Sequence, residues 1–221
     1  QLTDGDFDHG GPIAFAPDGA ALYVTADRTE DWAEDPVEAD LFRIDLADGT
    51  ITRLTDGDGP EVLVGPSPDG RTLAWTGFRD RQRIYQQADL WLRPTAGGGP
   101  RNLTEGFDRS VLEARWAEDG RGLWFLADDR GMRRLHHVTL SGTITRVDGD
   151  VGGTSLGRPY TSGDFDAGAD GRYVITRSRP DRPADLALGR RGGPLETVTA
   201  LNEDALGDLA LAPVEAITVR S

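Results

Sequence analysis

Short apolar segments and polar turns alternate along the whole chain. The first apolar segment covers residues 13–16, and a second, 22–25, follows it after a turn. Residues 41–46 then alternate apolar and polar side chains, which is the pattern of a strand with one buried face. Residues 50–54 complete the set. Four short strands joined by tight turns predict one antiparallel blade of a β-propeller.

The same set returns three more times. Its predicted strands are 62–65, 73–76, 89–93 and 101–104, then 112–116, 123–127, 133–140 and 143–147, and finally 163–168, 173–177, 185–189 and 195–199. An Asp-Gly pair lies between the first two strands of every set, at Asp18-Gly19, Asp69-Gly70, Asp119-Gly120 and Asp170-Gly171. Both residue types tolerate the positive φ angles of tight hairpins. A repeat of 50 or 51 residues that contains several strands is typical of propeller blades.

Two further repeated sequences concern the third and fourth strands. Asp-Leu opens the third strand of three sets, at Asp40, Asp89 and Asp185. The third set differs, because it has Arg134-Leu135 at this place. The sequence Arg-Leu-Thr-Asp-Gly at residues 53–57, where a fourth strand ends, resembles Gln-Leu-Thr-Asp-Gly at residues 1–5. Residues 1–5 are therefore predicted to be the outer strand of a preceding blade.

These patterns predict an all-β fold, a single partial β-propeller domain over residues 1–221. Its four four-stranded antiparallel blades are expected at about 11–57, 61–106, 111–149 and 161–201. Four blades and a leftover strand suit part of a larger ring, of about seven or eight blades, better than a closed four-bladed ring. We expect the open faces at both ends to be covered by missing blades or by another chain, as repeat proteins require.

Charge limits the partners of the protein. The 221 residues include 38 acidic and 24 basic ones, which gives a formal net charge of −14. Such a field repels nucleic-acid phosphates and anionic membrane surfaces, so we expect no nucleic acid and no membrane as a partner. No apolar run approaches the roughly 18 residues of a membrane-spanning helix, and no signal peptide is visible. The sequence starts with Gln1 rather than Met, so we do not expect this to be the native start. We expect a cytoplasmic protein.

The sequence context of the motifs that could carry catalysis argues against them. Residues 153–157 fit the Gly-x-Ser-x-Gly pattern of a nucleophile, which needs a strand before the serine and a helix after it. Glycines precede the motif, and Pro159 disfavours a following helix. His136 and His137 are neighbours in a predicted strand, so their rings point to opposite faces, and the chain lacks cysteine. We predict no catalytic residue, no metal site and no cofactor here.

Two places could contact a substrate. In the acidic segment 27–40, which includes Glu34 and Asp35, carboxylates lie beside a tryptophan and could hold a peptide amino terminus or a calcium ion. The alternative is a solvated insertion between strands. Arg158 and Tyr160 follow the glycine-rich segment, in a connection between blades that could meet a substrate carboxylate or carbonyl. The alternative there is an arginine that bridges two blades.

The block around each Asp-Gly pair resembles the TolB-type propeller repeat. More specifically, the whole chain is similar to part of the propeller domain of the prolyl oligopeptidase family of serine peptidases, in its acylaminoacyl-peptidase and dipeptidyl-peptidase-like branch. The segments that carry this resemblance are 1–8, 23–28, 152–160, 178–185, 199–202 and 213–221.

The resemblance implies a non-catalytic propeller that gates the active site of a serine peptidase and selects short peptides. Residues 204–221 would form the crossover toward an α/β-hydrolase domain of the same chain, which would hold the catalytic residues. The expected partners are this domain and a peptide substrate, and we expect that the protein can form a homo-oligomer. One alternative is a TolB-like propeller that binds proteins without hydrolase activity. Another is a propeller enzyme with its own site at the channel.

Overall fold

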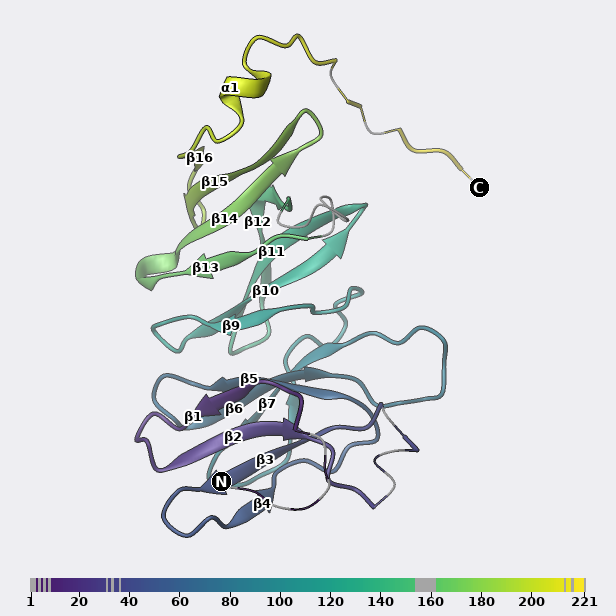
Figure 1. Ribbon diagram of the computed structural model, residues 1–221, viewed down its shortest axis with the longest axis vertical. Helices are drawn as coiled ribbons and strands as arrows, with labels where there is room; N and C mark the ends of the chain where they lie inside the picture. The colour runs from purple at the N-terminus through teal and green to yellow at the C-terminus, as the bar shows by residue number, and fades with distance from the viewer. Residues whose placement is uncertain are drawn as a thin grey trace. The chain divides into compact units, whose positions relative to one another are not determined.

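Almost all of the regular secondary structure in the computed structural model is β-strand (Figure 1). It describes residues 3, 5, 7, 9–30, 32, 34–35, 37–153, 162–212, 214–215 and 217–220. Each strand of the four predicted sets overlaps one of the strands β1 to β16, and a short helix, α1 (Glu203–Leu206), follows them. Of the predicted outer strand at residues 1–5, the described residues Thr3 and Gly5 are not in a strand. The described part of residues 207–220 contains no strand. No helix in the described ranges has the length and apolar character that crossing a membrane requires.

The strand bounds follow the predicted segments closely. The first two sets contain β1 (Ile13–Phe15), β2 (Ala21–Ala26), β3 (Asp40–Asp45), β4 (Ile51–Arg53), β5 (Glu61–Pro66), β6 (Thr72–Gly77), β7 (Asp89–Pro94) and β8 (Arg101–Asn102). The other two contain β9 (Ala114–Trp116), β10 (Gly122–Asp129), β11 (Met132–Thr139), β12 (Ile144–Val151), β13 (Phe165–Ala167), β14 (Arg172–Arg179), β15 (Arg182–Arg190) and β16 (Leu195–Thr197). The period of apolar residues therefore located the strands to within a few residues.

The chain divides into two compact units. Unit 1 comprises Gln1–Ala127 and His137–Thr145, and unit 2 comprises Asp128–His136 and Arg146–Ser221. In unit 1, β1–β4 and β5–β8 form two four-stranded antiparallel sheets, each with its strands in chain order. In unit 2, β14 pairs antiparallel with β13 and β15, and β15 pairs with β16.

The third and fourth strand sets are not separate sheets. The sequence predicts that β12 ends at Val147, but the strand continues to Val151, which pairs with Arg177 of β14. Gly149 makes this approach possible. An added Cβ there would lie 2.5 Å from Leu195 Cδ2 and 2.9 Å from Ile175 Cδ1. A larger residue would have to displace these side-chain ends and would be strained at the φ of +108°, so the position favours glycine.

The Asp-Gly pairs form the turns between the first two strands of each set, as predicted. In the first three turns the glycine has a φ of +71°, +71° or +66°, whereas the aspartate has no positive φ. Its carboxylate instead accepts a hydrogen bond from the backbone N–H two residues later. Asp170 differs, since its own φ is +65° within a 3-10 turn. Aspartate therefore acts mainly through its side chain.

A second repeated device joins the segment after the fourth strand to the third strand. The hydroxyl of Thr104 donates to Asp89 Oδ1 at 3.0 Å and accepts from the Leu90 N–H at 3.0 Å. We call this arrangement the latch. Equivalent latches join Thr55 to Asp40 and Leu41, and Thr199 to Asp185 and Leu186. In the third set, Arg134 forms an ion pair with Asp150. The latch explains why Asp-Leu recurs at the start of the third strand.

The core of unit 1 fills the spaces between its sheets. Tyr23 and Leu41 of the first sheet pack with Leu73 and Trp75 of the second. A separate apolar cluster contains residues of β6, β7, β10 and β11, with Phe125 fully buried. Burial of each such side chain contributes about 1.5–3 kcal/mol. These clusters fix the strands whose connections form the candidate site.

Candidate functional site

The connections of the first two sheets alternate between two ends of unit 1. Because consecutive strands are antiparallel, the Asp-Gly turns and the other short hairpins lie at one end, which we call the turn end. The connections 27–39, 54–60 and 78–88 lie at the opposite end, the loop end, at the right in Figure 1. The loop end therefore gathers the longer connections of both sheets.

Backbone hydrogen bonds hold the three connections of the loop end together. The N–H of Glu61 donates to the carbonyl of Ala39 at 3.0 Å, and the N–H of Ala39 donates to the carbonyl of Gly59 at 3.4 Å. The N–H of Asp80 donates to the carbonyl of Asp58 at 2.5 Å. Side chains from both sheets are thereby placed around a shared space.

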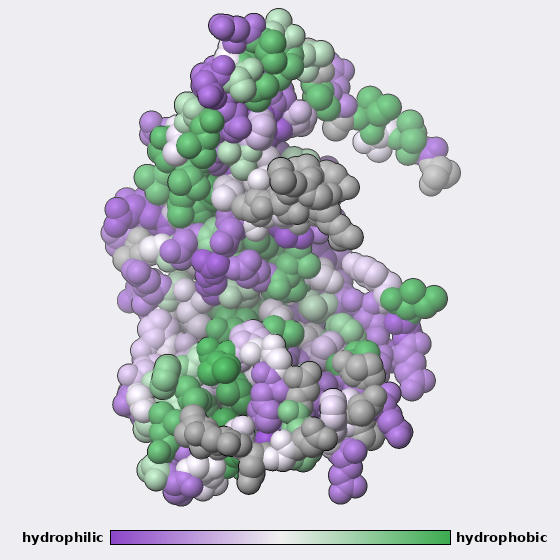
Figure 2. All heavy atoms as spheres, in the orientation of Figure 1, coloured by the Kyte–Doolittle hydropathy of each residue, from purple (hydrophilic) through white to green (hydrophobic). Residues whose placement is uncertain are grey.

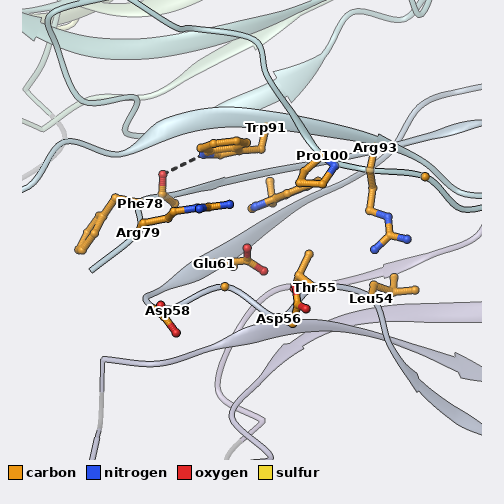
Figure 3. Close-up of a pocket in the computed structure, with 14 residues that line it drawn as sticks. Leu54, Thr55, Asp56, Asp58, Glu61, Phe78, Arg79, Trp91, Arg93 and Pro100 are labelled. Atoms are coloured by element: carbon orange, nitrogen blue, oxygen red, sulfur yellow. Dashed lines mark hydrogen bonds between the residues drawn. The ribbon is translucent and has the colours of Figure 1, made fainter. Parts of the chain in front are cut away.

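A cavity of about 300 Å³ lies beside the connections 54–60 and 78–88 of the loop end and extends along β7 to Gly98 and Pro100 of the β7–β8 hairpin. Figure 3 shows the carboxylates of Asp56, Asp58 and Glu61 along one side of it, and Arg79 and Arg93 along the other. Pockets that bind small ligands have volumes of roughly 300–1,000 Å³. The cavity is therefore large enough for the end of a short peptide, with opposite charges on its two sides.

Glu61, the first residue of β5, is the most perturbed acid of this cavity. Burial raises the pKa of its carboxyl group to about 7, and the carboxylates of Asp40 and Asp56 add to this. The nearby Thr55 hydroxyl and Trp75 indole, which can donate hydrogen bonds to the carboxylate, act in the opposite direction. The Oε2 atom of Glu61 is buried and accepts no hydrogen bond from a described residue. A ligand that donates a hydrogen bond would satisfy this oxygen.

Asp40, next to Glu61, already has partners. Its side chain is 1% exposed, and burial raises its pKa. An ion pair with Arg53 and the latch bond from Thr55 lower the pKa in part. Asp40 therefore shapes the field around Glu61, and Glu61 is the carboxylate that remains for a ligand.

Two tryptophans form an apolar wall of the cavity. The rings of Trp75 and Trp91 stack with their centroids 6.4 Å apart and an interplanar angle of 17°. The indole N–H of Trp91 donates to the carbonyl of Gly77 at 3.2 Å, which fixes the ring. A carboxylate beside aromatic rings suits an ammonium group, because both attract a cation.

Arg79 and Arg93 face this acidic and aromatic side. Neither guanidinium forms an ion pair or a hydrogen bond with a described residue. A guanidinium without a partner can donate to carbonyl or carboxylate oxygens of a ligand. The cavity thus offers acceptors for an amino group and donors for the oxygens that follow it in a peptide.

Two of the site residues predicted from the sequence, Glu34 and Asp35, do not line this cavity. Glu34 and Asp35 are exposed in the connection 27–39, and Asp35 Oδ1 accepts a hydrogen bond from the Val37 N–H at 3.2 Å. Arg158 and Tyr160 lie outside the described residues, as does Ser155 of the Gly-x-Ser-x-Gly pattern. Within the described ranges, no group of three or more His, Cys, Asp or Glu side chains is arranged to hold a metal ion.

Sequence reasoning missed Glu61 and the arginines of the connection 78–88. Nothing in the sequence around Glu61 distinguishes it, because its unusual state comes from burial by residues of two sheets. Arg79, Arg81 and Arg83 did leave a signal, since basic residues at alternate positions are unusual in a chain with 38 acidic and 24 basic residues.

Comparisons with known proteins address the fold and the resemblance. No protein-family model matches the chain. Dipeptidyl-peptidase 5 of Porphyromonas gingivalis is 25% identical over 201 residues, which are 89% of this chain and 28% of that protein. The chain therefore spans little more than a quarter of the length of this relative.

Solved structures agree with this similarity. The acylaminoacyl peptidase of Pyrococcus horikoshii superposes with a TM-score of 0.63 at 15% identity, over 90% of this chain and 28% of that one. A structure described as a putative TolB from Agrobacterium tumefaciens gives a TM-score of 0.62 at 20% identity, over 84% of this chain and 63% of that one. The predicted resemblance is confirmed. Over most of its length the chain is similar to the propeller domains of peptidases, and its propeller fold is TolB-like.

Proposed function

We propose that this chain is a non-catalytic, substrate-selecting part of a serine peptidase that cleaves short peptides, of the acylaminoacyl- or dipeptidyl-peptidase type. The similarity to dipeptidyl-peptidase 5 over 89% of the chain supports this role. In this proposal the catalytic residues lie in an α/β-hydrolase domain of the same protein. The propeller restricts access to that domain and admits short peptides only.

The proposal includes that the strands belong to four blades of a ring of seven or eight. Exposed apolar side chains support it. In unit 1, Ile13 and Phe15 of β1 are 63% and 66% exposed. In unit 2, Leu186 and Leu188 of β15 are 41% and 47% exposed. Large side chains exposed on the face of a sheet are a common sign of a missing partner. Neighbouring blades of the ring would cover them.

The observation that carries the proposal is the cavity at Glu61. An ammonium group can satisfy the buried Oε2 atom and lie against the tryptophans, while Arg79 and Arg93 receive the oxygens of the first residues. This arrangement would select a free amino terminus, which favours the dipeptidyl-peptidase type over the acylaminoacyl type. Glu34 with Asp35, and Arg158 with Tyr160, remain proposals for further substrate contacts, and the cytoplasmic location remains one as well.

The alternative is a TolB-like propeller that binds proteins and has no hydrolase activity. The likeness to the putative TolB structure, of which the chain covers 63%, favours this possibility. One simple measurement distinguishes the two proposals. A peptidase will hydrolyse a panel of dipeptidyl and acylaminoacyl substrates when the complete protein of this gene is purified, and a binding module will not.

Steady-state kinetics of the complete protein test the role of Glu61. We expect Glu61→Gln to raise KM at least tenfold for a peptide with a free amino terminus, which corresponds to about 1.4 kcal/mol. We expect kcat to stay within twofold, because Glu61 does not take part in the chemistry. The same peptide with an acetylated amino terminus should be cleaved equally by both proteins.

The matched control is Glu118→Gln, which removes the same charge from an exposed residue at the turn end. It should leave KM unchanged. An equal loss for free and acetylated peptides, or no loss at all, would contradict the proposal that Glu61 binds the amino terminus.

A further inference from the structure

We propose that a second cavity at the loop end binds carboxylates of acidic peptides through Arg79, Arg81 and Arg83. This inference names a substrate class and rests on the proposed peptidase role. The three arginines belong to the connection 78–88 between β6 and β7, and all three line one cavity of about 710 Å³. This cavity shares Phe78, Arg79 and Trp91 with the cavity at Glu61.

The three guanidinium groups have no partner among the described residues. None forms an ion pair or a hydrogen bond with a described residue, although acidic residues outnumber basic ones by 38 to 24. In such a chain an arginine readily finds a carboxylate, as Arg43 does in Asp45 at 3.0 Å. Guanidinium groups that lack internal partners remain available for carboxylates of a ligand, which they bind with charge-assisted hydrogen bonds.

Internal hydrogen bonds order the segment that carries these arginines. The carboxylate of Asp80 accepts bonds from the Gln82 N–H at 2.6 Å and from the side-chain amide of Gln86 at 2.5 Å. The side-chain carbonyl of Gln86 accepts from the Arg81 N–H at 2.6 Å. Gln82 has a φ of +53°, a strained value for a residue other than glycine. Ordering of the backbone lowers the entropy cost of binding at the arginines.

The other charges of the cavity do not cancel the arginines. Asp89 lines the cavity, but its two oxygens accept bonds from Thr104 and Asn102, so it belongs to the latch. Glu105 is exposed, and it is the remaining acid of the lining. The lining therefore contains three guanidinium groups and two carboxylates. One of these carboxylates, that of Asp89, is already hydrogen-bonded within the protein.

The cavity favours a peptide over a compact anion. Its lining includes the rings of Tyr85 and Trp91, which offer apolar surface to side chains. In Figure 2 the projecting connection, at the right, combines hydrophobic spheres at its tip with hydrophilic ones beneath. One or two arginines are enough for a phosphate ion, whereas three arginines along a large cavity suit carboxylates spread over several residues.

Peptide binding by the complete protein tests the inference. The probes are N-methylated peptides, which bind without being cut, with the sequences Ala-Ala-Glu-Glu-amide and Ala-Ala-Gln-Gln-amide. We expect the native protein to bind the acidic peptide at least tenfold more tightly. The variant Arg81→Gln/Arg83→Gln should reduce this preference to twofold or less. Arg79 is left in place because it also lines the cavity at Glu61.

The matched control is Arg71→Gln/Arg121→Gln, which removes two exposed arginines at the turn end and should retain the preference. Equal affinity of the native protein for both peptides would overturn the inference, as would tighter binding of inorganic phosphate than of the acidic peptide. A loss of thermal stability in Arg81→Gln/Arg83→Gln with an unchanged preference would also overturn it, and would assign these arginines to the neighbouring acidic connection 27–39.

The same experiment separates this inference from the proposed function. Selective binding of the acidic peptide by a protein that hydrolyses no peptide would refute the peptidase role and retain the arginine site. Hydrolysis of short peptides without any preference for acidic residues would support the peptidase role and refute the arginine site.

Discussion

The two ends of unit 1 use polar residues in opposite ways. At the turn end, Asp18, Asp69 and Asp119 each accept a hydrogen bond from a backbone N–H two residues away. At the loop end, Glu61 has a buried oxygen that accepts no hydrogen bond from a described residue, and the side chains of Arg79, Arg81 and Arg83 bind none either. The carboxylates of the turn end form hydrogen bonds with the backbone nearby, whereas the loop end has charged groups that are available to a ligand.

This difference separates stability from function within one pair of sheets. A turn that satisfies itself over two residues can recur in every repeat, because it does not depend on its neighbours. The cavity at Glu61 takes side chains from the connections 54–60 and 78–88, whose sequences differ, so the same cavity is not expected to recur with the repeat. Substitutions at the turn end should therefore change the free energy of unfolding, and substitutions at the loop end should change ligand binding.

Glu61 is the exception, and it gives the largest expected effect. Its pKa of about 7, against 4.5 ordinarily, means that the folded state binds the proton more tightly than the unfolded state. Its contribution to stability is complete below pH 4.5 and is lost as the pH rises through 7. The loss amounts to at most about 3 kcal/mol. Urea unfolding between pH 5 and 8 should show it in the native protein and not in Glu61→Gln.

Glu118→Gln again serves as the control and should keep the full pH dependence. If Glu61→Gln has the same slope of stability against pH as the native protein, the perturbed state of Glu61 is refuted.

The second expected effect concerns the hydrogen bonds of the latch. Thr104→Val retains the shape of the side chain but leaves the Leu90 N–H and one oxygen of Asp89 without a partner. Thr104 is fully buried, so the free energy of unfolding should fall by about 2 kcal/mol. Thr52→Val, at an exposed position of β4, is the matched control and should change it by less than about 0.5 kcal/mol. Equal stability of the two variants would deny the latch a structural role.

The third effect tests the turn end directly. Gly70 has a φ of +71°, and a Cβ added there would lie 3.3 Å from the ring of Pro17. Gly70→Ala should cost about 1–2 kcal/mol, because a left-handed conformation is unfavourable for alanine. Gly99 has no positive φ and open space around it, so Gly99→Ala should be neutral or slightly stabilising. Thermal unfolding measures both, and peptide binding should be unchanged in Gly70→Ala.

The smallest effect gives the turn end a pH response of the opposite sign. The Ser67 hydroxyl and the Arg71 N–H hold the pKa of Asp69 below its ordinary value of 3.8. This contribution to stability is present above pH 3.8 and is lost as the pH falls through the lower, folded pKa. NMR titration of the Asp69 carboxyl group should find a midpoint below 3.8, and Ser67→Ala should raise it. A midpoint at or above 3.8 would contradict the bond from Ser67.

The strands could be predicted well because the sequence pattern of each strand in a set occurs four times along the chain. The Asp-Gly pairs fixed the first hairpin of every set, and the Asp-Leu pairs fixed the start of the third strand. The extension of β12 to Val151 was not predictable, since it depends on the contact of Gly149 with Leu195 and Ile175. Such contacts join residues that lie far apart in the sequence.

The candidate site was predicted less well, for a related reason. Acid clusters drew attention to Glu34 and Asp35, but both are exposed. The unusual acid is Glu61, and only burial by parts of two sheets makes it so. Charge alone cannot show which carboxylate loses its water. The arginines at 79, 81 and 83 were missed as well, because the sequence does not show the cavity that they line.

The latch also bears on how such a chain can grow. Each latch closes a set with residues of that set alone, from Asp89 to Thr104 in one case and from Asp185 to Thr199 in another. A duplicated segment of about 50 residues therefore contains all the residues of its own latch, and this contact does not depend on the neighbouring segments. Gene duplication could add or remove such segments one at a time, so the number of repeats can change during evolution while the architecture of each one is inherited intact.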